Sequence, residues 1–154
     1  MKIIDFLNQK AISVNLVAQN KKKAIEELVD LLIKTGENVE KETLIKTLIE
    51  RENLGSTGIG QGVAIPHGKS DTIKKLTAAF GISKKGVEFV ALDGEPVHIF
   101  FLLVIPQNSS GQHLKALARV SRLLKNKNFC LSLCKANDEK ELLRIILNED
   151  RRRE

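Results

Sequence analysis

The chain has 154 residues, of which 42% are hydrophobic and 29% charged, and its formal net charge is +6. This length fits one domain that buries about 70% of its unfolded surface, and the composition is ordinary for a globular protein. No run approaches ~18 consecutive apolar residues and no signal-peptide core is present, so we predict a cytoplasmic protein without membrane insertion. Without Trp or Tyr to stack on bases, nucleic acid is a disfavoured partner.

The N-terminal segment predicts one strand and one helix. Residues 12–16 alternate apolar and polar side chains, as a half-buried strand does. Asn20 offers an N-cap to a helix with apolar residues at i, i+3, i+4 and i+7, and Gly36 ends it. The three lysines at 21–23 oppose the dipole of this helix, and the sequence offers no reason for them beyond solubility.

A second predicted helix, about residues 41–52, leads into the stretch with the most chemistry. Arg51 lies in its last turn, where the helix dipole favours a cation. Four glycines follow within residues 55–62, and such a run can direct several backbone N–H groups into a small concavity that suits an anion.

The glycine-rich run ends in Pro66-His67-Gly68. Proline fixes its own φ and favours an extended residue before it, so the His67 imidazole is expected at a stiff strand end. An imidazole near its neutral form at cellular pH can attack phosphorus without a separate deprotonation step. His67 is therefore the candidate nucleophile.

The chain beyond His67 is predicted to be rich in strands. We expect strands at 78–82, 87–90 and 97–105, with turns at 84–86 and 93–94. The third strand is apolar almost throughout and is expected to be buried on both faces. His98, near its start, is expected to be a packed or rim residue.

A helix is predicted from Gln112 to Leu124, with Ser109 or Ser110 as its N-cap. Its expected inward-facing residues are Leu114, Leu117, Ala118, Ser121 and Leu124, and its expected outward basic stripe is Arg119, Arg122 and Lys125. His113 falls in the first turn, where a helix N-terminus attracts phosphate and an imidazole N–H can donate to a phosphoryl oxygen.

The C-terminal segment offers no further chemistry. Cys130 and Cys134 share one helix face without a third ligand nearby, which predicts small buried thiols in a reducing compartment. Asp138 and Glu141 form an acidic capping box ahead of a final helix, and residues 151–154 are predicted to be a frayed tail.

Motifs for other chemistries fail in detail. Residues 62–70 approach a P-loop, but five residues separate the glycines and a proline removes a needed N–H. The G-x-G-x-G run at 58–62 follows a helix, whereas a dinucleotide fingerprint follows a strand. No G-x-S-x-G elbow, paired carboxylates or H-E-x-x-H metal motif occurs. By elimination, any chemistry belongs to His67.

The stretch from Arg51 to Gly68 resembles the phosphorylation-site signature of the enzyme IIA domains of the bacterial phosphotransferase system. It is most similar to the fructose/mannitol (type 2) class and, within it, to the nitrogen-regulatory branch. The matching segments are Arg51-Glu52, Leu54–Gly60, Gly62–Gly68, Gly86–Phe89, Leu92–Val97 and His113–Ala118. The resemblance thus covers nearly the whole chain.

This resemblance implies an α/β fold: a single domain over residues 1–154, with a mixed β-sheet flanked by helices on both faces. It implies that His67 is the phosphoryl acceptor, with Arg51 and His113 beside it in the catalytic site. The implied phosphate-binding positions are Gly55, Ser56, Thr57, Gly60 and Gly62. No cofactor or metal is expected, because transfer between two nitrogen-linked phosphates is nearly isoenergetic.

The implied donor is a small histidine phosphocarrier protein, and the implied acceptor or reader is an enzyme IIB or a regulatory target. Since no enzyme IIB or IIC segment is recognisable, we expect a regulatory, nitrogen-type phosphohistidine carrier more than a sugar-transport component. A stand-alone fructose- or mannitol-type enzyme IIA stays open, as does a binding module that is never phosphorylated. The sequence leaves open which ring nitrogen reacts, the downstream partners and the oligomeric state.

Overall fold

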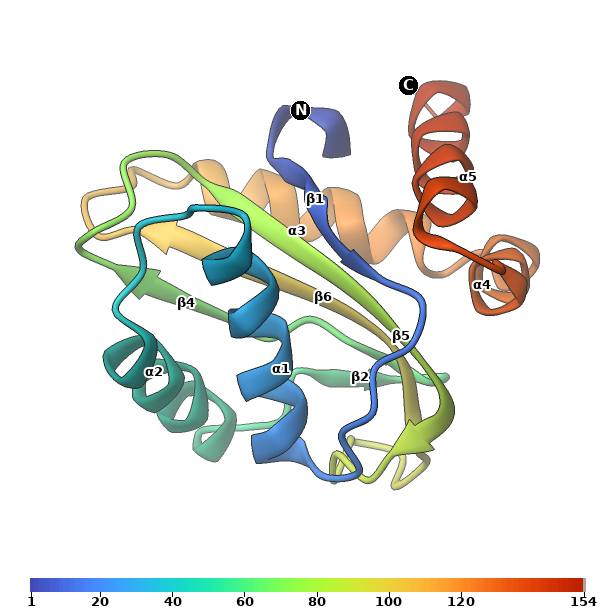
Figure 1. Cartoon of the computed structure of the whole chain (residues 1–154), viewed down its shortest axis with the longest axis horizontal. Coiled ribbons are helices and arrows are strands. Elements are labelled where there is room, and N and C mark those ends of the chain that lie inside the picture. The colour runs from blue at the N-terminus through green and yellow to red at the C-terminus, as the bar shows by residue number, and fades with distance from the viewer. Residues whose placement is uncertain (154) are drawn as a thin grey trace.

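Strand β6 (Val97–Pro106) is the centre of the fold. A computed structural model describes residues 1–153 and places β6 between β5 and the short strands β3 and β4, within a six-stranded sheet (Figure 1). The other strands are β1 (Leu7–Ser13), β2 (Gly58–Gly60), β3 (Val63–Ala64), β4 (His67–Ser70) and β5 (Thr77–Val87). The order is β1-β5-β6-β3-β2, with β4 also paired to β6.

The sheet is mixed, as predicted. β5–β6 and β2–β3 are antiparallel, whereas β1–β5, β3–β6 and β4–β6 are parallel. Along β6, alternate side chains enter two separate hydrophobic clusters. Ile99 and Phe101 belong to one cluster and Phe100 and Leu102 to the other. Burial of both faces explains why the β6 sequence is apolar almost throughout.

Helices cover both faces of the sheet, which confirms the predicted architecture. Helices α1 (Lys21–Lys34) and α2 (Lys41–Asn53) pack on one face. Helices α3 (Gln112–Leu123), α4 (Lys127–Lys135) and α5 (Glu139–Arg152) pack on the other with the 3-10 turn η1 (Ile3–Asp5). In Figure 1, α1 lies in front of the sheet and α3 behind it.

Two predicted helix starts are confirmed by their caps. Asn20 Oδ1 accepts a hydrogen bond of 3.0 Å from Lys23 N at the start of α1. Asp138 Oδ1 accepts one of 2.8 Å from Glu141 N at the start of α5. Such caps satisfy backbone N–H groups that have no partner within the helix.

Three strand predictions were wrong in their limits. β1 covers Leu7–Ser13, not residues 12–16, because its pairing with β5 ends at Ser13 although the alternating burial continues. β5 runs through the predicted turn at 84–86 as one strand, with a register shift between Ile82 and Val87. Gly86 adopts φ +90° within this bulge. Because glycine at positive φ also occurs in turns, the Lys84-Lys85-Gly86 sequence was predicted as a turn. Residues 88–90 form only an isolated bridge, between Asn20 and Glu88.

Helix α3 differs from its prediction in both cap and orientation. Its N-cap is Gly111, at φ +108°, and neither serine side chain caps it. The buried positions are Ala116, Arg119, Val120 and Leu123, whereas Leu114 is 63% exposed. Of the predicted inward residues, Leu124 is buried and Leu117 packs against the core, whereas Leu114 and Ala118 are exposed, so the apolar spacing placed the inward face only in part.

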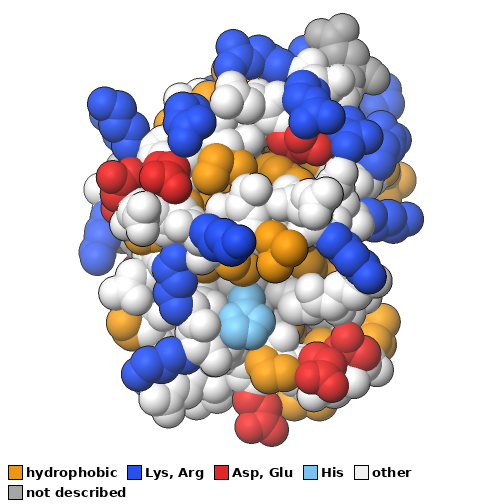
Figure 2. Space-filling view, turned by 90° about the vertical axis from the view of Figure 1, so that its right-hand side faces the viewer, with side chains coloured by type: hydrophobic (Ala, Val, Ile, Leu, Met, Phe, Trp, Pro, Cys, Tyr) orange, Lys and Arg blue, Asp and Glu red, His pale blue; other side chains and the backbone are white. Residues whose placement is uncertain are grey.

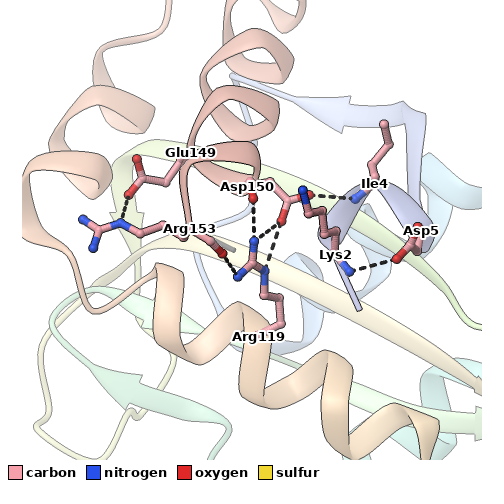
Figure 3. Close-up of polar contacts among 7 residues, drawn as sticks. All are labelled: Lys2, Ile4, Asp5, Arg119, Glu149, Asp150 and Arg153. Atoms are coloured by element: carbon pink, nitrogen blue, oxygen red, sulfur yellow. Dashed lines mark hydrogen bonds and ion pairs between the residues drawn. The ribbon is translucent and has the colours of Figure 1, made fainter.

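Arg119 was predicted on the outer stripe but is 5% exposed. Its Nη2 lies 2.8 Å from Asp150 Oδ1 and its Nε 3.1 Å from the same oxygen, and Arg119 also donates to the backbone oxygen of Arg153 (Figure 3). Asp150 Oδ2 in turn accepts from Ile4 N at 3.1 Å. This ionic network joins α3, α5 and the N-terminal turn.

The predicted frayed tail is likewise corrected for residues 151–153. Arg151 and Arg152 belong to α5, and Arg153 N donates to Glu149 O at 3.2 Å while its Nε donates to Glu149 Oε2 at 3.1 Å. Residue 154 lies outside the described residues.

We expect Arg119→Met to lower the free energy of unfolding by about 3 kcal/mol, because it leaves the Asp150 carboxylate buried without its partner. Urea denaturation followed by circular dichroism measures this change. Arg122→Met, an exposed position on the same helix, is the matched control and should change stability by less than about 0.5 kcal/mol. Equal stability of the two variants would contradict a structural role for the Arg119 ion pair.

Candidate active site

His67 opens strand β4 and is half-buried. β4 is held in register by pairing of His67 with Leu103 and by the hydrogen bond from Leu103 N to Pro66 O, 2.9 Å long. A side chain at Gly68 would lie 3.2 Å from carbon atoms of Thr47 and Leu48, so glycine here lets α2 pack closely against β4. The predicted stiff strand end is present.

One hydrogen bond determines which ring nitrogen of His67 is free. His67 Nδ1 lies 2.7 Å from the backbone oxygen of Ile65. Because a carbonyl oxygen only accepts, Nδ1 carries the proton, and in the neutral ring Nε2 keeps its lone pair. The nucleophilic atom of this imidazole is therefore Nε2.

The surroundings favour the neutral form of His67. Burial is the largest influence and lowers its pKa below the usual value near 6.5, and the charges of Arg51 and His113 lower it further. The hydrogen bond to Ile65 and the charge of Glu52 act in the opposite direction without reversing the result. At neutral pH the lone pair on Nε2 is thus available.

The structure brings the predicted catalytic residues into one electrostatic neighbourhood. Arg51 lies in the last turn of α2 and His113 in the first turn of α3, and the charges of both lower the pKa of His67. Arg51 Nη1 donates a 2.8 Å hydrogen bond to Gly55 O, which holds the guanidinium beside the loop that follows α2. His113, half-buried, has a long contact of 3.4 Å between its Nδ1 and Ser109 Oγ.

The loop after α2 satisfies most of its own hydrogen-bonding groups. Thr57 N donates to Glu52 Oε1 at 2.8 Å, and Thr57 Oγ1 donates to the same oxygen. Gly55 N donates to Glu52 O at 3.1 Å, and Ser56 Oγ accepts from Gly58 N at 2.9 Å. The phosphate-binding role predicted for Thr57 does not fit, because both of its donors are occupied by a carboxylate.

Gly60 and Gly62 lie away from His67, contrary to their predicted role. They flank the β2–β3 turn, at φ +97° and +81°, and Gly62 O accepts from the backbone N of Ile99. Gly62 bonds to Ile99, whereas His67 pairs with Leu103, so the two contacts lie four residues apart on β6, about 13 Å along the strand at ~3.3 Å per residue. These glycines serve a tight turn, which a glycine count cannot distinguish from a phosphate cradle.

Glu52 was missed as a candidate site residue. It is 5% exposed, follows Arg51 directly and binds the loop through Thr57. The only signal in the sequence was its place in the Arg51-Glu52 pair. Its burial depends on residues brought from α1 and from the loop, so local periodicity could not reveal it.

A hollow of about 350 Å³ lies around His98 at the far end of β6. It is lined by Gln61, Gly62, His98, Ile99, Lys127, Cys130, Leu131 and Cys134. Figure 2 shows a face where one histidine is bordered by hydrophobic side chains, with lysines and arginines to its left and above it and acidic side chains below it. His98 Nδ1 is bound to Ser83 O at 2.9 Å, which fits the predicted rim residue.

Cys130 and Cys134 are free, half-buried thiols. Burial raises both of their pKa values, that of Cys130 to about 11, so both stay protonated at neutral pH. Within residues 1–153, no three His, Cys, Asp or Glu side chains come together as metal ligands. Nor does any helix in that range combine the length and hydrophobicity that crossing a bilayer demands.

Comparison with known proteins identifies the family. A profile described as "Phosphoenolpyruvate-dependent sugar phosphotransferase system, EIIA 2" matches residues 5–149. The chain belongs to this family. Among individual EIIA relatives, a "Nitrogen regulatory protein" of Bradyrhizobium diazoefficiens is 35% identical over 147 residues, which are 95% of each chain.

Two further EIIA relatives complete the comparison. The "PTS system fructose-specific EIIABC component" of Bacillus subtilis is also 35% identical, over 98% of this chain, which spans only 24% of that longer protein. The crystal structure of nitrogen regulatory protein IIA-Ntr from Neisseria meningitidis superposes with a TM-score of 0.85 at 35% identity, covering 94% of this chain and 98% of that one. The EIIA fold and family predicted from the sequence are thereby confirmed.

Proposed function

We propose that this EIIA protein carries a phosphoryl group on Nε2 of His67. The observation that supports this most directly is the 2.7 Å hydrogen bond from Nδ1 to Ile65 O, which leaves Nε2 as the nucleophile of a neutral ring. Nε2 attacks the phosphorus of a donor phosphohistidine in line. A new N–P bond forms as the donor's N–P bond breaks, and its electron pair returns to the donor imidazole.

The charge on the transferred phosphoryl oxygens is stabilised by groups already near His67. Arg51 supplies a fixed cation, and His113 supplies an imidazole N–H at the start of α3. Among the predicted phosphate-binding positions, Ser56 lies in the loop that Arg51 contacts, and its hydroxyl accepts from Gly58 N and can still donate to a phosphoryl oxygen. Ser56 keeps this proposed role, whereas Gly55, whose N–H is bonded to Glu52 O, shapes the backbone together with Thr57, Gly60 and Gly62.

The donor is a histidine phosphocarrier protein, in the cytoplasm. Two apolar side chains next to the catalytic residues suit a protein partner: Leu54 is 86% exposed and Leu114 is 63% exposed. They follow Arg51 and His113 closely in the chain, so a partner that covers them also covers the phosphoryl group. Exposed apolar side chains beside a reactive group are typical of interaction surfaces.

We assign the protein to the regulatory, nitrogen-type branch. Support comes from the 0.85 TM-score and 35% identity with Neisseria IIA-Ntr, against 0.76 and 22% for the mannitol IIA of Escherichia coli. The 35% identity with the fructose-specific Bacillus protein carries the second candidate, a sugar-transport EIIA that passes phosphate to an enzyme IIB. Incubating the phosphorylated protein with a fructose-type enzyme IIB separates the two, since only the second candidate transfers.

The test is intact-mass spectrometry after incubation with phosphoenolpyruvate, enzyme I and the histidine phosphocarrier. We expect one added, acid-labile phosphate, and nitrogen NMR of the product should show the modification at Nε2 of His67. No added phosphate on this protein, with the two donors shown to be charged, would overturn the proposal and leave the unphosphorylated binding module.

A further inference from the structure

A buried carboxylate lies beside the proposed active site and takes no part in the transfer described above. The side chain of Glu52 is 1% exposed. The other buried charged residues within 1–153 are Arg119, Glu149 and Asp150, which lie in the network between α3 and α5. Burial of a carboxylate is unfavourable unless its oxygens are hydrogen-bonded or paired with a cation. The partners of the Glu52 oxygens therefore indicate the role of this carboxylate.

One oxygen of Glu52 faces a cation from another helix. Oε2 accepts no hydrogen bond of good geometry within residues 1–153 and instead lies 3.0 Å from Lys21 Nζ. The same ammonium is 4.8 Å from the centroid of the Phe89 ring, and the Lys21 side chain is only 24% exposed. Lys21 is thus fixed between a carboxylate and an aromatic face. This contact accounts for a lysine at the first position of α1, where the helix dipole disfavours it.

The other oxygen of Glu52 begins a series of hydrogen bonds, connected through the backbone of Thr57 and Ile65, that ends on the His67 imidazole. Oε1 accepts from Thr57 N at 2.8 Å, and Thr57 O accepts from Ile65 N at 3.0 Å. Ile65 O then accepts from His67 Nδ1 at 2.7 Å. The backbone group that selects the His67 tautomer is therefore anchored, through Thr57 and Glu52, to Lys21.

We infer that Lys21 and Glu52 form a positioning pair, in which Lys21 on α1 balances the buried Glu52 charge so that the Thr57–Ile65 backbone presents Nε2 of His67 for phosphorylation. The inference deepens the proposed function and rests on it for its consequence in transfer. Lys21 does not touch the reacting atoms. It acts through Glu52 and the backbone.

The charges around His67 set the direction of the effect. Arg51 and Glu52 face it from α2 and His113 faces it from α3, and among these the Glu52 carboxylate alone raises the pKa of His67. Without the Lys21 ammonium, the Glu52 charge is no longer balanced and stabilises the imidazolium form. Removal of Lys21 should therefore raise the pKa of His67 and reduce the fraction of rings with a free Nε2.

The experiment compares Lys21→Met with Lys22→Met in the full chain. Lys22 is exposed and lies one residue further along α1. The Lys22→Met substitution therefore removes the same charge without changing the ion pair with Glu52. An NMR titration of His67 should give a pKa raised by roughly half a unit in Lys21→Met and unchanged in Lys22→Met. The ¹⁵N chemical shifts of the His67 ring should show a smaller fraction of the neutral tautomer protonated at Nδ1 in Lys21→Met than in the wild type. Phosphorylation by the charged phosphocarrier should slow about tenfold in Lys21→Met only.

Two more variants exclude a merely structural effect. Lys21→Arg keeps the cation and should restore the wild-type His67 titration. Adding Glu52→Gln to Lys21→Met removes the unbalanced charge and should lower the pKa of His67 again. Identical His67 titrations in Lys21→Met and Lys22→Met would overturn the inference. Because the titration needs no phosphoryl donor, this outcome is distinguishable from a failure of the proposed function, which appears as an unphosphorylated wild type.

Discussion

His67→Asn is expected to abolish phosphorylation by the charged phosphocarrier. The asparagine side chain keeps a short amide donor where Nδ1 lies, so the contact with Ile65 O can persist while the nucleophile at the Nε2 position is lost. The fold should be retained, because His67 is half-buried at the start of a four-residue strand that pairs through its backbone. Intact-mass spectrometry under donor excess should show no added phosphate.

His98→Asn is the matched control for this variant. It makes the same change in a histidine whose Nδ1 is likewise bound to a backbone oxygen, but at the far end of β6. It should accept one phosphate at the wild-type rate. An acid-labile phosphate on His67→Asn would place the acceptor elsewhere, with His113 as the first alternative.

Arg51→Met is expected to slow phosphorylation of His67 by about 10²–10³-fold, the usual cost of losing one preorganised charge-stabilising group. The guanidinium is held by its 2.8 Å hydrogen bond to Gly55 O and acts electrostatically on His67. Loss of this cation also removes an influence that lowers the pKa of His67, so the decrease should be larger below pH 6.5 than at pH 8. Rapid-quench measurement of phosphate transfer gives the rate at each pH.

Lys46→Met, which removes an exposed cation from the same helix, controls for the change in net charge. It should transfer at the wild-type rate, while Arg51→Lys should be intermediate because it keeps the charge and loses the planar guanidinium. His113→Gln tests the second stabilising group in the same assay. Wild-type rates in both Arg51→Met and His113→Gln would contradict the proposed site beyond His67.

Local patterns were sufficient for much of the scaffold. The almost continuous apolar run of β6, the Asn20 cap of α1 and the Asp138 cap of α5 each involve neighbours in the chain, and all three are present. Pro66 restricts the backbone before His67 by covalent geometry alone. These features follow from steric and hydrogen-bonding rules that operate within a few residues, so a sequence contains what is needed to predict them.

The error on α3 depends on a distant partner. Arg119 is buried against expectation because Asp150, 31 residues further along the chain, supplies a buried counter-charge. Helical periodicity ranks residues by their own polarity and cannot include a partner from another helix. Of the basic residues expected on the outer face of α3, Arg122 and Lys125 are exposed and Arg119 is buried.

The sequence by itself predicted the α/β fold class and most helices, His67 as the candidate nucleophile, and, through the family resemblance, Arg51 and His113 as its neighbours. The tertiary structure decided which nitrogen of that histidine is free, because Ile65 O reaches Nδ1 only in the folded turn before β4. It also decided that Thr57 donates to Glu52 and that Gly60 and Gly62 flank the β2–β3 turn, which contacts β6 four residues before the residue paired with His67. Hydrogen-bond partners and burial arise from contacts between segments far apart in the chain, and these exist only after folding.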